Sequence, residues 1–112
     1  YGPIPRGAGL PPLPPMELPP TFGGERREVV PDDVVLSRVM LAFRIPAFGT
    51  DGHDDASMLA TILGTRAGSR LQRSLVRDRQ LASEVGAFTY DLTKGSDLLI
   101  LDAVARPEVD VA

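Results

Sequence analysis

Residues 98–101 are Leu-Leu-Ile-Leu, and they lie in a nearly continuous apolar run from 97 to 106. The preceding segment, 84–92, alternates Val85, Ala87 and Thr89 with residues of the opposite face. Period-two alternation and a short apolar run are both typical of β-strands. The Thr-Lys-Gly-Ser segment at 93–96 is a turn, and strands joined by so short a connection must be antiparallel. The fold is therefore predicted to include a β-hairpin.

Two further strands are predicted before the hairpin. In residues 35–45 the odd positions are apolar, apart from Ser37, so that this face is expected to be core. Arg38 and Arg44 share the even face with three apolar residues, which predicts a second face that is half covered. Residues 25–30 resemble a short charged edge strand that stops at Pro31.

Two helices are predicted between these strands. Asp54 or Asp55 is the expected N-cap of the first, Gly64 is its expected C′ residue, and its apolar face consists of Ala56, Leu59, Ala60 and Leu63. Ser69 and Gln72 match a capping box that opens the second helix, which extends to Arg79. The predicted class is α+β: a two-layer structure of order β-β-α-α-β-β, with helices packed on one face of an antiparallel sheet.

Composition and charge exclude several classes of partner. The chain has 112 residues, a net charge of -3 and no cysteine. Phosphate backbones and anionic lipids attract clustered positive charge, so we expect neither nucleic acid nor membrane as a partner. No segment has the apolar length or the basic start of a membrane span or signal peptide. Absence of cysteine is compatible with both the bacterial periplasm and the cytoplasm.

Proline marks the predicted domain boundary. Eight of the 11 prolines lie between Pro3 and Pro20, where they favour polyproline II. Residues 1–24 are therefore predicted to be an inter-domain linker. The alternative is a ligand for SH3 or WW domains, because the P-x-x-P spacing occurs twice. Residues 25–112 form the predicted folded domain, and a helix onset at its end suggests a truncated piece of a longer chain.

His53 is the single histidine, and Asp51, Asp54 and Asp55 surround it. A catalytic zinc site usually has two or more imidazole or thiolate ligands on rigid elements, and a calcium loop needs more oxygen ligands. The sequence therefore favours a solvated turn at His53 over a metal site.

No other segment carries a recognisable reaction centre. A Gly-x-Ser-x-Gly elbow is absent, so no serine is assigned as a nucleophile. Residues 64–69 could cradle an anion, but a connector between helices needs the same glycines. Arg70, Arg73, Arg77 and Arg79 predict a solvated basic helix face, or a cavity lining for acidic or extended peptides. We assign no catalytic, metal or substrate-binding residue to this chain.

Several segments in order resemble the insulinase/pitrilysin family of zinc peptidases, in particular mitochondrial-processing-peptidase-like members. They are 62–64 (Ile-Leu-Gly), 68–71 (Gly-Ser-Arg-Leu), 75–82 (Leu-Val-Arg-Asp-Arg-Gln-Leu-Ala), 41–48 and 103–107. Residues 1–7 are similar to the end of the first half of such proteins. The resemblance covers nearly the whole chain and places it in the second, non-catalytic half.

The resemblance implies two homologous α+β halves that close around a chamber, in which a peptide adds as a strand and zinc-bound water cuts it. Zinc is expected in the first half of the parent protein, with the motif His-x-x-Glu-His. Many second halves also offer an Arg and a Tyr that grip the substrate. Val76 and Ser83 occupy those places here, and Arg77 is one residue out of register.

Three hypotheses follow. The first is a non-catalytic piece of an insulinase-like metallopeptidase, partnered by the first half of the parent chain or by a peptidase subunit, with peptide substrate in the parent. The second is an inactive structural or assembly subunit, and the third is a Pro-rich interaction module. Because truncation would uncover apolar surface, we also expect self-association.

Overall fold

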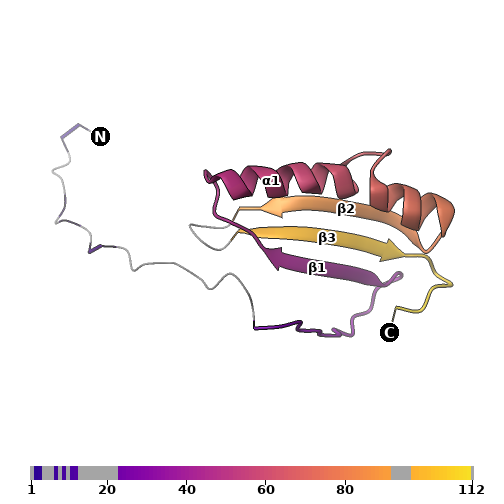
Figure 1. Cartoon of the computed structure of the whole chain (residues 1–112). Helices are drawn as coiled ribbons and strands as arrows, with labels where there is room; N and C mark the ends of the chain where they lie inside the picture. Colours follow the sequence, from indigo (N-terminus) through magenta and orange to yellow (C-terminus); the bar gives the residue numbers. More distant parts are fainter. Residues whose placement is uncertain are drawn as a thin grey trace.

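The computed structural model describes residues 2–3, 7, 9, 11–12, 23–91 and 97–111, and the helices and strands between Arg38 and Ala105 form an α+β domain. Its strands are β1 (Arg38–Arg44), β2 (Ala82–Tyr90) and β3 (Leu98–Ala105). Three helical segments lie between β1 and β2: α1 (Asp51–Ala60), η1 (Thr61–Thr65) and η2 (Gln72–Asp78). Figure 1 shows the helices as one layer above the sheet. The predicted class and two-layer architecture are confirmed.

The sheet is antiparallel and has the order β1-β3-β2. β2 and β3 form the predicted hairpin, in which Ala87 pairs with Leu101 and Thr89 with Leu99. β1 joins the other side of β3, so that Leu41 also pairs with Leu101. β3 is therefore central, which explains why its sequence is apolar on both faces. The predicted turn at 93–96 lies outside the described residues.

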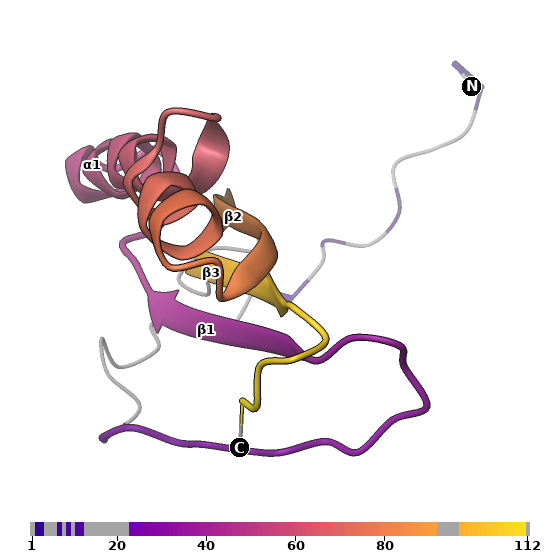
Figure 2. The same ribbon diagram turned by 90° about the vertical axis from the view of Figure 1, so that its right-hand side faces the viewer.

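The core lies between the helices and the strands β2 and β3. Ala60, Ala87 and Leu99 form its buried centre, and Ile45, Leu63 and Leu101 pack against it. α1 contacts β2 and β3, whereas η1 and η2 contact β2. Figure 2 shows the same arrangement from the side, with β1 farthest from the helices.

The prediction that the odd face of β1 is core was wrong for Leu41 and Phe43. In register with Leu99 and Leu101, Phe43 and Leu41 point to the helix side of the sheet, yet they are 49% and 50% exposed. These side chains are exposed because the helices lie over β2 and β3 and do not extend over β1.

The predicted strand at 25–30 was also wrong, and the observed order is β-α-α-β-β. Residues 25–34 have no strand assignment, and Val29 and Val30 are exposed. Two adjacent valines lack the alternation that would bury one face, so no packing energy offsets the ordering of this segment. Most of the predicted linker 1–24 lies outside the described residues.

The first helix begins earlier and continues further than predicted. α1 starts at Asp51 after Thr50, and Asp51 and Asp54 lie in its first turn, where carboxylates stabilise a helix N-terminus. It then continues into η1, which contains Gly64. Gly64 is therefore not a C′ residue; it lies inside a helix where the helix meets β2.

The second helix follows Ser69 as predicted, but the capping box does not form. Residues 70–71 begin the helix and η2 continues it. The Oγ atom of Ser69 is buried and has no hydrogen-bond partner. At the other end the Leu81 N–H donates to the carbonyl of Leu75 (2.9 Å), and Gln80 has a φ of 54°. This closure resembles the left-handed caps that glycine usually occupies.

Replacing Gln80 by glycine is expected to raise the free energy of unfolding by about 0.5–1 kcal/mol, because glycine adopts positive φ without a Cβ penalty. The variant Gln80→Ala keeps the Cβ and is the matched control, for which we expect no gain. Urea unfolding followed by circular dichroism measures both. Equal stability of the glycine and alanine variants would show that the left-handed conformation is not the cause.

Candidate functional site

A histidine and two aspartates from three parts of the chain meet at one end of the domain. His53 lies in the first turn of α1, Asp91 follows β2 and Asp97 precedes β3. The connected ends of a hairpin lie at the same edge of a sheet, which brings the two aspartates together. The His53 Nε2 atom is 2.8 Å from Asp91 Oδ1. One ligand atom from each of the three residues lies within 4.8 Å of the others.

Asp97 of this cluster also accepts hydrogen bonds from the segment that follows β1. Phe48 N–H donates to Asp97 Oδ2 at 2.5 Å, and Ile45 N–H donates to the Asp97 carbonyl at 3.1 Å. The Phe48 ring packs edge-on against the His53 ring, with centroids 5.2 Å apart. His53 is 4% exposed and Asp97 is 2% exposed. The cluster therefore joins α1, the post-β1 segment and the hairpin.

Electrostatics favour the charged form of His53. The hydrogen bond to Asp91 raises its pKa above the ordinary value, and the negative charges of Asp91 and Asp97 add to this effect. Burial acts in the opposite direction, because it disfavours the charged ring, but the net shift of the pKa is upward. The Nδ1 atom is buried without a hydrogen bond, and Asp54 Oδ1 lies 3.8 Å from it.

The free energy of unfolding of the metal-free protein is expected to fall as the pH rises above about 6.5. The pKa of His53 is higher in the folded state than in the unfolded chain, so the folded state binds the proton more tightly. Its contribution is complete below the unfolded pKa and disappears as the pH rises through the folded pKa. Urea unfolding in chelator across this range measures the slope, and His53→Gln should reduce it. An identical slope in the variant would contradict the assignment.

The prediction of a solvated turn at His53 was wrong. The sequence neighbours Asp51 and Asp55 are exposed, whereas the residue that pairs with His53 is 38 positions away. The sequence did contain a signal: one aspartate stands at each end of the predicted hairpin connection. Placing the ends of paired strands at a common edge would have brought Asp91 and Asp97 together, but not His53.

The other candidate residues do not join this cluster. The four arginines of the predicted basic face, Arg70, Arg73, Arg77 and Arg79, are exposed. Residues 66–69 connect η1 to the second helix, whereas residues 64–65 of the predicted connector 64–69 lie inside η1. Val76 lies half-buried in η2, and Ser83 is exposed on β2, where its Oγ donates to the Val104 carbonyl at 3.2 Å.

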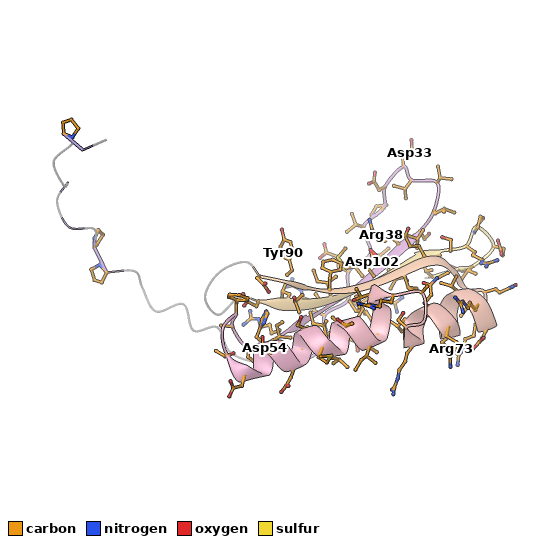
Figure 3. All side chains as sticks on the ribbon, turned by 90° about the horizontal axis from the view of Figure 1, so that it is seen from above. Asp33, Arg38, Asp54, Arg73, Tyr90 and Asp102 are labelled. Carbon is orange, nitrogen blue, oxygen red and sulfur yellow. The ribbon has the colours of Figure 1, made fainter. Side chains whose placement is uncertain are left out.

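The sheet face opposite the helices carries an ion pair and several exposed apolar and aromatic side chains. Arg38 Nε donates to Asp102 Oδ2 at 2.7 Å, and these two residues lie side by side in Figure 3. Register places Met40, Phe88 and Tyr90 on the same face, because paired residues point to one side of a sheet. All three side chains are exposed. The described domain thus presents an open face of mixed apolar, aromatic and paired charged character.

Comparison with protein families gives a match over residues 2–112 to the family described as the Peptidase M16 inactive domain. The chain belongs to this family. A solved structure described as a protease from Helicobacter pylori superimposes on this M16 domain with a TM-score of 0.59 and 29% sequence identity. The match covers 70% of this chain and 19% of that chain, so the M16 domain spans less than a fifth of that protease. A comparison with curated proteins finds no match.

Membership of the non-catalytic M16 domain agrees with the resemblance seen in the sequence. The chain has one histidine, so the zinc motif His-x-x-Glu-His is absent. The His53 cluster does not fit the peptidase zinc either, because it offers a single imidazole and is not part of a His-x-x-Glu-His motif. No helix in the described part of the chain is long and apolar enough to cross a membrane.

Proposed function

We propose that this M16 domain forms part of the wall of the peptide-binding chamber of a zinc metallopeptidase, and that the catalytic half supplies the zinc and the reacting groups. The observation that carries the proposal is the match to the inactive domain over residues 2–112, supported by the likeness to a protease. On this proposal the domain is a non-catalytic component whose partners are the catalytic half and a peptide.

The exposed surfaces of the domain support this role. Met40, Phe88 and Tyr90 lie on the open face, and Leu41 and Phe43 are exposed on the helix side of β1. Exposed apolar surface of this kind marks sites of contact with other protein or peptide. The buried carboxylate of Asp102 is paired with Arg38, which allows the face to carry charge without an uncompensated buried group.

Reconstitution tests the proposal. The full chain is mixed with the catalytic half that carries His-x-x-Glu-His from the same organism, and hydrolysis of a quenched fluorescent peptide is followed. We expect the mixture to cleave at least about tenfold faster than either half alone, because the chamber positions the peptide. A chelator should abolish the activity.

A pair of matched substitutions sharpens this test. Phe88→Ser alters the open face, whereas Val34→Ser changes an exposed apolar residue that precedes β1. We expect Phe88→Ser to raise the KM for peptide and Val34→Ser to leave it unchanged. Equal KM values for the two variants would show that the open face does not contact the peptide. If the M16 domain has no effect on hydrolysis, the proposed function is wrong.

Val76 and Ser83 favour a second candidate, an inactive structural or assembly subunit. The resemblance implies an Arg and a Tyr at these positions. Val76 has no hydrogen-bond donor in its side chain, and the Ser83 hydroxyl donates to the Val104 carbonyl of the same sheet at 3.2 Å. The same reconstitution distinguishes the candidates. A stable complex in size-exclusion chromatography without faster hydrolysis would support the assembly role. We also expect the isolated chain to self-associate, because its exposed apolar surface can be buried between copies. Light scattering measures this.

A further inference from the structure

We propose that His53, Asp91 and Asp97 bind a divalent transition-metal ion of the zinc class, which clips the first turn of α1 to the connected ends of β2 and β3. Their three ligand atoms lie within 4.8 Å of one another. Ligands of a tetrahedral zinc site are separated by about 3.3 Å, since each lies at 2.0–2.2 Å from the metal. The cluster is therefore nearly assembled. His53 Nε2 and Asp91 Oδ1, which are 2.8 Å apart without an ion, would separate slightly to admit it, and water would be a fourth ligand.

The charges of the cluster suit a divalent cation. Two carboxylates and a neutral imidazole carry a charge of about −2, which one divalent ion neutralises. Asp97 is 2% exposed, and a buried carboxylate is stable only when it is paired or coordinates a metal. An imidazole ligand favours zinc-like ions over calcium and magnesium, which prefer all-oxygen sites.

The unpartnered nitrogen of His53 points to the same conclusion. His53 is 4% exposed, and its Nδ1 has no hydrogen bond. Metal-bound histidines usually present the second nitrogen as an N–H donor to a carboxylate behind the ring. Asp54 Oδ1 lies 3.8 Å from Nδ1, and the Asp54 side chain is 88% exposed, so it is free to approach. A metal ion bound at Nε2 would place the proton of the neutral ring on Nδ1, which could then donate a hydrogen bond to Asp54.

This ion would be a structural clip and not the metal of peptide hydrolysis. It would replace the direct His53–Asp91 contact and hold together elements that are separated in sequence. The Phe48 N–H bond to Asp97 Oδ2 fixes the orientation of that carboxylate, as second-layer partners do in metal sites. The proposal does not depend on the function proposed above.

Calorimetric titration of Zn²⁺ into the chelator-treated full chain tests the clip. We expect one ion per chain, a dissociation constant in the micromolar range or tighter, and a higher melting temperature with zinc. Asp91→Asn keeps the shape of a partly exposed side chain and should weaken binding at least about tenfold. Asp55→Asn is the control, because Asp55 is an exposed neighbour of His53 outside the cluster, and its affinity should stay within about twofold of the unsubstituted chain.

Three further measurements complete the test. Circular dichroism establishes that metal-free Asp91→Asn is folded, and the visible absorption of bound Co²⁺ reports imidazole and carboxylate ligands. Ca²⁺ and Mg²⁺ should bind at least about tenfold more weakly than Zn²⁺. No zinc binding in the micromolar range, equal affinity of the Asp91→Asn and unsubstituted chains, or equal affinity for Ca²⁺ would overturn the proposal.

Discussion

Gly64→Ala is expected to lower the free energy of unfolding by about 3 kcal/mol or more. A Cβ at position 64 would lie 2.5 Å from the Ala87 nitrogen and 2.7 Å from the Gly86 carbonyl carbon. Both are backbone atoms of β2, so relief requires the helix and the strand to separate. The effect opposes helix propensity, which by itself favours alanine over glycine by about 1 kcal/mol.

Gly68→Ala is the matched control for this substitution. Nothing lies within 4 Å of a Cβ at position 68, and its φ is not left-handed. We expect its stability to stay within about 0.5 kcal/mol of the unsubstituted chain. Urea unfolding by circular dichroism compares the two variants. A Gly64→Ala protein as stable as Gly68→Ala would contradict the close approach of η1 and β2.

Asp97→Ala is expected to lower the free energy of unfolding by about 2–3 kcal/mol. The substitution removes the acceptor of the Phe48 N–H and a negative charge near the His53 ring. The Phe48 N–H would then lack this partner, whereas His53 would keep its contact with Asp91. Urea unfolding with and without chelator measures the loss and separates it from any effect of bound metal.

Asp97→Asn supplies the control for that prediction. The amide oxygen still accepts from Phe48, so in chelator the loss should be smaller than for alanine and should reflect mainly the missing charge. Asp55→Asn should have little effect. Equal losses for Asp97→Ala and Asp97→Asn would mean that the hydrogen bond to Phe48 contributes nothing measurable.

Much of the fold could be predicted from local patterns. The apolar run of β3 and the alternation of β2 specify a hairpin, because side chains of a strand alternate between faces. The stripe of Ala56, Leu59, Ala60 and Leu63 predicts a helix that packs on the hairpin, although Leu59 itself is exposed in the structure. These features depend on residues a few positions apart, which is why sequence alone was sufficient.

Other predictions failed where the deciding contact was remote. Val29 and Val30 looked like a strand, but a strand needs a partner edge, and residues 25–34 do not join the sheet. Gly64 looked like a helix terminator, yet its role is set by the backbone of β2. The odd face of β1 was predicted to be buried, but its burial depends on whether the helices extend over β1, which local sequence does not determine.

The candidate site shows the same division. Sequence by itself determined that the chain lacks the catalytic zinc motif, that it is α+β, and that it resembles a non-catalytic peptidase half, since these depend on which residues are present and on their local order. Only the tertiary structure decided that His53 is buried against Asp91 and Asp97. The physical reason is that short-range periodicity sets strands and helices, whereas the packing of α1 on the hairpin sets which distant side chains share one low-dielectric site.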